Sequence, residues 1–184
     1  YIYFVFLLCC AVNLLLTSCV RQKYVVMDMV HHNPGEAMTE SKFLDPSFLK
    51  KNEYGAKVFF LFEAAQFGID WKSFDPSLFP DTTEAGRWVA EKAEIIHKKY
   101  DAAKKEDLQV YCMLDMLVLP SLLVEKHRTE LTNEQGKLDI SKPYTQLCIR
   151  ELMKEMFETF PQLDGLVIRT GETYLHDAPY YVGN

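Results

Sequence analysis

Four predominantly apolar segments, rich in β-branched and aromatic side chains, alternate with helix-forming stretches along this chain of 184 residues. The segments are 24–30, 57–62, 109–114 and 166–168. They form apolar runs and do not alternate between apolar and polar residues, which is typical of parallel strands covered on both faces. Because parallel strands need long crossover connections, the pattern predicts βα units and an α/β fold with a parallel sheet.

The stretches between the apolar segments include two amphipathic helices. One begins near Thr82 or Thr83, either of which can cap it, and repeats an apolar residue every three or four positions. The other ends at Pro161 and places Glu155 on its polar side. Its predicted apolar face consists of Ile149, Leu152, Met153, Met156, Phe157 and Phe160. Shorter helices are expected at 43–51 and 122–128, and each long helix should bury one stripe against the sheet.

Two architectures begin with four such units: an open doubly wound sheet and a closed (β/α)8 TIM barrel. No Gly-x-Gly-x-x-Gly follows the first strand, which argues against the dinucleotide-binding version of the open sheet. Polar or aromatic residues follow all four strands, as if several loops shared one site, which favours the barrel. A barrel typically has about 250 residues. We therefore expect 20–184 to be the N-terminal half of a TIM barrel, with an open parallel α/β sheet as the alternative.

Residues 1–16 are almost wholly apolar, with Asn13 as the one strongly polar residue. The run is shorter than the ~20 residues that span a bilayer, but long enough for a secretion signal. It leads into Leu-Thr-Ser-Cys19, which resembles the lipobox of bacterial lipoprotein signals. We interpret 1–19 as a partial signal peptide, so that the protein is exported to the cell envelope and tethered to a membrane by a lipid on Cys19. The alternative is a buried hydrophobic segment.

Composition limits the partners. The hydrophobic fraction of 48% can build a substantial core, and the net charge of −6 argues against a nucleic acid partner. Beyond the proposed signal the cysteines are Cys112 and Cys148, whose apolar contexts indicate core packing instead of a disulfide framework or a zinc site. A disulfide between these two stays open.

The ends of the predicted strands carry the candidate functional residues. The fourth strand is followed at once by Arg169, Thr170, Gly171 and Glu172, and the third ends at Asp115. In parallel α/β folds such loops converge at the carboxyl ends of the strands. A carboxylate close to an arginine suits an acid/base site, although an ordinary ion pair that stabilises a loop is the alternative.

Two stretches, Val30–Glu36 and Asp164–Tyr174, resemble a group of exported barrel proteins of gut-type bacteria that are described as glycoside hydrolases. More distantly, Arg-x-Gly-Glu at the close of the fourth strand is similar to what β-hexosaminidase-like and α-glucuronidase-like barrels show. The resemblance runs from about Lys23 to the end of the chain. It implies sugar hydrolysis with an acidic residue in this stretch as proton donor, and it implies no particular sugar.

Glycosidic cleavage supports the same candidates on chemical grounds. It generally needs two carboxyl groups, ~5 Å apart for retention and ~6.5–9.5 Å apart for inversion. Glu172 is the predicted proton donor, and Asp115 or a residue beyond this chain is the second carboxylate. A contact with Arg169 would oppose a raised pKa at Glu172, so we expect the arginine to hold a substrate hydroxyl or carboxylate instead.

Further polar and aromatic side chains at the same end are predicted to contact a carbohydrate, because sugar rings stack on aromatic faces. The predicted substrate-binding set is His31, His32, Asn33, Arg169, Tyr174, His176 and Tyr181, with Trp71 and Tyr180 as further aromatic candidates.

Two other classes stay open. A metal-dependent hydrolase could use His31, Asp115, Glu172 and His176, but their spacing matches no common metal motif, so we predict no metal and no cofactor. A barrel without a complete carboxylate pair would be a glycan-binding surface lipoprotein.

Overall fold

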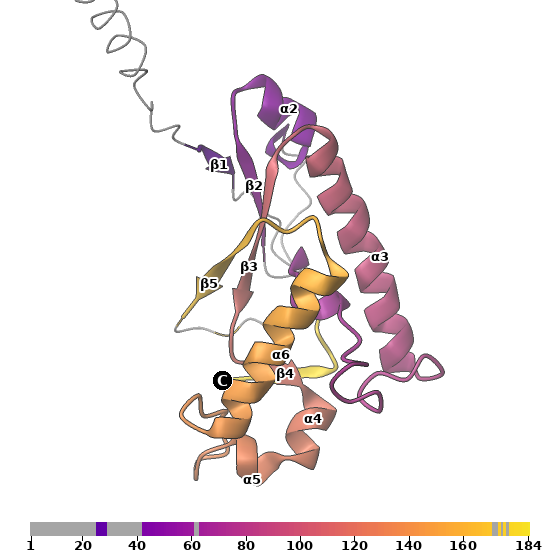
Figure 1. Cartoon of the computed structure of the whole chain (residues 1–184), viewed down its shortest axis with the longest axis vertical. Helices are drawn as coiled ribbons and strands as arrows, with labels where there is room; N and C mark the ends of the chain where they lie inside the picture. Colours follow the sequence, from indigo (N-terminus) through magenta and orange to yellow (C-terminus); the bar gives the residue numbers. More distant parts are fainter. Residues whose placement is uncertain (1–24, 29–41, 61–62, 171–172, 174, 176) are drawn as a thin grey trace, which may run out of the picture.

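The computed structural model describes residues 25–28, 42–60, 63–170, 173, 175 and 177–184. Within this part of the chain a four-stranded parallel sheet has the order β1-β2-β3-β5. The strands are β1 (Met27–Asp28), β2 (Ala56–Phe59), β3 (Gln109–Asp115) and β5 (Gly165–Arg169) (Figure 1). They lie side by side in chain order, and the predicted mixed α/β fold with a parallel sheet is confirmed. Closure of the sheet into a barrel stays a prediction.

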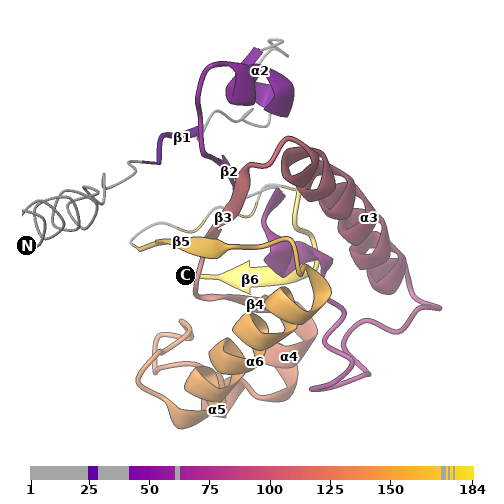
Figure 2. The same ribbon diagram turned by 45° about the horizontal axis from the view of Figure 1, so that its top comes forward.

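Two long helices, α3 (Glu84–Lys105) and α6 (Pro143–Thr159), lie on the same side of the sheet (Figures 1 and 2). The cap of α3 is Thr83, whose Oγ1 accepts a hydrogen bond from the backbone N–H of Gly86 at 3.0 Å. Near the ends of both helices the rings of Tyr100 and Phe160 meet edge to face, with centroids 5.7 Å apart. The helices therefore share one core with the sheet.

The start of the chain is described only in part. After β1 come η1 (Lys42–Leu44) and α2 (Pro46–Lys51), which together cover the helix predicted at 43–51; α2 begins at Pro46 because Asp45 caps it. The proposed signal peptide, including Cys19, lies outside the described residues, so export and lipid attachment remain predictions. None of the helices that the structure describes is long and apolar enough to cross a membrane.

The connection from β2 to α3 contains a short buried helix, η3 (Ala65–Gly68), where the sequence predicts only a loop. It packs against both α3 and α6. A Cβ on Gly68 would lie 2.9 Å from Cα of Ala93 and 2.7 Å from the ring of Phe160. Only glycine allows this close approach, so η3 fills the space between the two helices.

The buried face of α6 differs from the predicted one. Phe157 is 40% exposed, whereas Glu155 is only 6% exposed. Glu155 accepts a hydrogen bond from the Ser73 hydroxyl in the loop that precedes α3. A buried carboxylate needs such a partner. Because the partner is far away in the sequence, residue type alone placed Glu155 on the wrong side.

A second, two-stranded antiparallel sheet joins β4 (Val118–Pro120) and β6 (Tyr181–Gly183). Neither of these two strands is among the four predicted from the sequence, which places Tyr181 among the substrate-binding candidates instead. Two short helices, α4 (Ser121–Lys126) and α5 (Arg128–Leu131), follow β4. The pairing returns the chain after β5 to the end of β3, and so it shapes the region where the candidate residues lie.

Two expectations on core packing have different outcomes. Cys112 and Cys148 are both buried and free, as core packing predicts. In contrast, Ile168 on β5 is 47% exposed, so the expectation that this strand is buried on both faces is not met. Among the described residues β5 pairs with β3 along one edge.

Candidate functional site

A polar cavity of about 450 Å³ opens at the carboxyl ends of β3 and β5. The two strands are in register there, with Asp115 opposite Arg169. The cavity is lined by Asp115, Met116, Leu117, Lys137, Arg169, Thr170, Thr173 and Asn184. Asp115 and Arg169 therefore lie together at the ends of their strands, as the sequence predicts.

Asp115 and Arg169 form a bidentate ion pair. Nε of Arg169 donates to Oδ1 of Asp115 at 2.7 Å, and Nη2 donates to Oδ2 at 2.9 Å. The Asp115 side chain is 3% exposed and that of Arg169 is 22% exposed. Such two-point contacts fix the plane of the guanidinium as well as its position. The carboxylate is therefore the buried anchor, and the arginine extends from it toward the cavity.

This geometry changes the interpretation of both residues. Both oxygens of Asp115 accept hydrogen bonds from Arg169, so Asp115 holds the arginine in position. Its role as the second catalytic carboxylate stays a prediction. An ordinary ion pair was the alternative to an acid/base site at Arg169. The structure shows such a pair, with Asp115 as the partner.

Another wall of the cavity is the loop at 133–137, where Asn133 and Gly136 are turn signals in the sequence. Asn133 Oδ1 accepts from the backbone N–H of Lys137 at 3.0 Å, and Gly136 has a φ of 75°. Asn184 binds Leu138 twice: Oδ1 accepts from its N–H at 2.7 Å and Nδ2 donates to its C=O at 2.8 Å. These bonds hold the backbone that presents Lys137 to the cavity.

Most of the predicted site lies outside the described residues. This applies to the proposed proton donor and to five of the predicted substrate-binding residues: Glu172, Tyr174, His176, His31, His32 and Asn33. Their roles remain predictions. Thr170 and Thr173, which flank Gly171 and Glu172 in the sequence, both line the cavity.

Tyr181 and Trp71 lie in the core instead of on a cleft surface. Tyr181 is 5% exposed, its hydroxyl donates to the Gln66 carbonyl at 3.2 Å, and its ring stacks on Phe79 with centroids 5.6 Å apart. Burial raises the pKa of Tyr181 well above its ordinary value. Trp71 is fully buried. Neither ring presents a face on which a sugar could stack. Tyr181 is drawn inward by the pairing of β6 with β4.

No group of three or more His, Cys, Asp or Glu side chains able to hold a metal ion occurs among the described residues. Three of the four residues considered for a metal site, namely His31, Glu172 and His176, are not among them.

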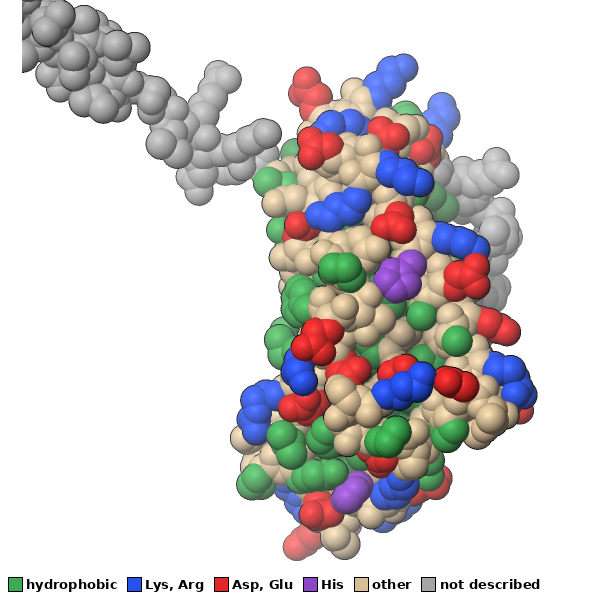
Figure 3. Space-filling model, turned by 45° about the vertical axis from the view of Figure 1, so that its right-hand side comes forward, with side chains coloured by type: hydrophobic (Ala, Val, Ile, Leu, Met, Phe, Trp, Pro, Cys, Tyr) green, Lys and Arg blue, Asp and Glu red, His purple; other side chains and the backbone are tan. Residues whose placement is uncertain are grey.

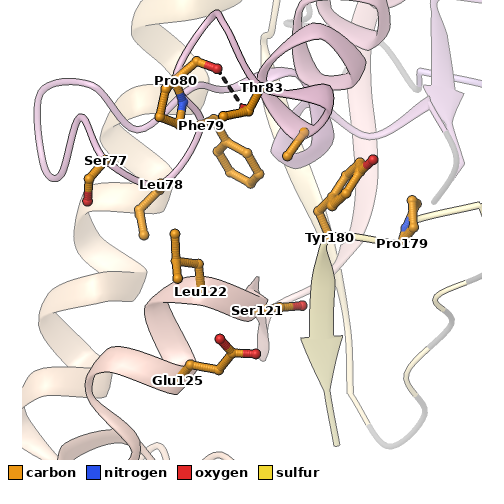
Figure 4. A pocket seen from close by; sticks show the side chains of 11 residues that line it. Ser77, Leu78, Phe79, Pro80, Thr83, Ser121, Leu122, Glu125, Pro179 and Tyr180 are labelled. Atoms are coloured by element: carbon orange, nitrogen blue, oxygen red, sulfur yellow. Dashed lines mark hydrogen bonds between the residues drawn. The ribbon is translucent and has the colours of Figure 1, made fainter.

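A second cavity, of about 310 Å³, lies on a different part of the molecule and is mainly apolar (Figure 4). It is formed by the loop before α3, the start of α4 and the residues before β6. It shares no lining residue with the polar cavity.

Charged side chains of both signs are interspersed with apolar ones on the face seen in Figure 3. No patch of a single sign dominates that face. Its surface therefore offers no extended basic stripe of the kind that tracks a phosphate backbone.

No protein-family model and no curated protein matches the chain. One solved structure is similar, a noncanonic maltogenic alpha-amylase AmyB from Thermotoga neapolitana, at 16% sequence identity and a TM-score of 0.48. The match covers 82% of this chain and 40% of the amylase chain, so the chain spans less than half of that protein's length. A likeness of this size says nothing about activity or substrate.

Proposed function

We propose that the protein is a glycoside hydrolase whose substrate binds in the polar cavity at the carboxyl ends of β3 and β5. The observation that carries the proposal is the bidentate Asp115–Arg169 pair at the edge of this cavity. It holds the guanidinium of Arg169, with its positive charge, rigidly at a cavity that Thr170 and Thr173 also line. Ligands rich in hydroxyl groups need such fixed donors and acceptors.

In this proposal the chemistry belongs to the loop after β5. Glu172 donates a proton to the glycosidic oxygen while the bond from that oxygen to the anomeric carbon breaks, and water supplies the group that replaces it. Arg169, oriented by Asp115, donates hydrogen bonds to a substrate hydroxyl or carboxylate. Asp115 is the candidate for the second carboxyl group.

The proposal is tested by blocking the cavity. Thr170 is exposed and lines it, so Thr170→Trp should fill the space without disturbing the core. We expect release of nitrophenol from a panel of p-nitrophenyl glycosides by the wild type, and at least about a tenfold loss for the variant, since misplacement by about 1 Å already costs as much as 10²-fold. The matched control is Thr129→Trp, which changes another exposed threonine, on α5, that does not line the cavity; this variant should keep full activity.

Equal activity in the two tryptophan variants would place the reaction elsewhere.

One observation favours a second candidate function, glycan binding without cleavage: both oxygens of Asp115 are already bound by Arg169. A wild-type protein that binds sugars with sensitivity to Thr170→Trp, yet releases no nitrophenol from any glycoside of the panel, would establish this second function instead.

A further inference from the structure

The apolar cavity of about 310 Å³ has the size and the walls of a small-molecule site. Figure 4 shows side chains from three separate segments around a common space: Leu78 and Phe79 from the loop before α3, Leu122 from α4, and Tyr180 from the residues before β6. Leu78 and Phe79 are each 2% exposed, whereas Leu122 is 39% exposed and forms the accessible wall. The cavity therefore continues from the core to the surface.

The loop that forms one wall is tied firmly to α4. Lys126 on α4 pairs with Asp75 at 2.9 Å, and the Ser77 hydroxyl donates to Asp75 at 2.6 Å. The Ser77 hydrogen bond, followed by the hydrogen bond from Lys126, lowers the pKa of Asp75 to about 2. The loop thus needs little reorganisation when a ligand enters, which favours binding.

The other end of the same loop is fixed at the start of α3. The Thr83 hydroxyl donates to the Pro80 carbonyl at 2.7 Å. Gly86 packs so closely that an added Cβ would lie 2.1 Å from the same carbonyl oxygen. The hydroxyls of Ser77 and Thr83, two of the four hydroxyl-bearing residues that line the cavity, are therefore engaged within the protein, and the walls offer mainly apolar contact.

Tyr180 supplies a fixed aromatic wall. Its ring meets Trp88 edge to face with centroids 5.7 Å apart, and the backbone N–H of Ser121 donates to its carbonyl at 2.8 Å. Burial, followed by the negative charge of Glu84 and a hydrogen bond to it, raises the pKa of Tyr180. The packing on Trp88 thus holds the ring of Tyr180 in place as a wall of the cavity.

The charged groups around the cavity favour a cation. Glu125 lines it, one helical turn after Leu122 on α4 (Figure 4). Lys126 is neutralised by Asp75, whereas Arg87, whose Nη1 donates to the Thr82 carbonyl at 3.0 Å, keeps its charge and acts on Tyr180 together with Glu84. Two carboxylates, those of Glu84 and Glu125, thus outweigh one guanidinium, and a positively charged ligand is complementary to this balance.

We propose that this cavity is a second ligand site, which takes a small organic cation with a compact apolar body, such as an arylalkylamine. The apolar body packs between Tyr180, Phe79 and Leu122, and the ammonium group lies at the Glu125 carboxylate. The site is independent of the proposed glycosidase activity.

The test uses phenethylamine and its neutral counterpart 2-phenylethanol, titrated separately into the full chain and followed by backbone amide NMR shifts. Phenethylamine should bind with a dissociation constant on the order of 1 mM, as expected for a ligand of this size. The alcohol should bind about three- to fivefold more weakly, the usual range for one partly exposed charge pair. Shifted signals should belong to residues 77–85, 121–125 and 179–180.

Two variants separate charge from packing. Glu125→Gln should abolish the preference for the amine and leave the alcohol's affinity unchanged, whereas Glu158→Gln, an exposed glutamate on α6, should change neither. Leu122→Ser should weaken both compounds. Equal affinity of the two compounds for the wild type, an unchanged preference in Glu125→Gln, or shifts confined to other residues would each overturn the proposal.

Discussion

At the residue scale the Asp115–Arg169 pair is the firmest feature of the candidate site. The sequence places both residues at strand ends, and the rule that parallel strands end at one edge brings them to the same region. It does not predict their bond, because that depends on the register of β3 against β5, which neither segment specifies by itself. Lys137 and Asn184 were missed because loop contacts leave no periodic pattern.

The two partners should respond differently to substitution, because their exposures differ. Arg169→Met leaves the Asp115 carboxylate, 3% exposed, without its bidentate partner and should lower the free energy of unfolding by about 3 kcal/mol. Asp115→Asn should cost about 1–2 kcal/mol, since the amide keeps one acceptor oxygen and the more exposed guanidinium still reaches water. Urea unfolding at pH 7 measures both values.

The double variant Asp115→Asn/Arg169→Met is the control for coupling, and it should cost less than the sum of the two single changes. A larger cost for Asp115→Asn than for Arg169→Met would contradict the view that the carboxylate is the buried anchor.

At the element scale, long periodic segments were predicted well and short non-local ones were not. The helix α3 begins at Thr83, one of its two predicted caps, and α6 ends just before Pro161 as predicted, because a capping threonine, a proline and apolar spacing are local signals. The pairing of β4 with β6 joins residues about sixty positions apart, and η3 is held by Gly68 against two helices. Neither contact has a local signature, and so Tyr181 was assigned to a cleft instead of the core.

Asp75, which joins the loop before α3 to α4, should make stability depend on pH. Its pKa of about 2 in the folded protein lies below the ordinary value of 3.8, so its contribution is present above pH ~4 and is lost as the pH falls toward ~2. Asp75→Asn should lower the free energy of unfolding by about 1 kcal/mol at pH 7, a value discounted because the side chain is 25% exposed.

The measurement is urea unfolding of the wild type and Asp75→Asn at several pH values from 7 to 2.5. The difference between the two proteins should shrink as the pH falls. A difference that stays constant over this range would show that the Asp75 charge does not stabilise the loop.

At the scale of the whole molecule, the alternation of apolar strands and helices was sufficient to predict a parallel sheet, because parallel neighbours need long crossover connections and the helices supply them. It did not fix the order of the strands, since barrels and doubly wound open sheets are built from the same right-handed βα units. The reaction is harder to predict from the sequence than the fold. It depends on which residues stand around Glu172, and these residues form no periodic pattern. The proposed glycosidase activity therefore depends most on Glu172, which we propose as the proton donor.

The most direct test compares wild type and Glu172→Gln on two aryl glycosides that share one sugar and differ only in the leaving group. The glutamine keeps the shape of the side chain and removes its titratable proton. Turnover of the glycoside with the poor leaving group should fall by ~10²–10⁴-fold, the usual contribution of general acid catalysis. The glycoside whose leaving group needs little protonation should lose far less. An equal loss on both substrates, or no loss on either, would contradict the account.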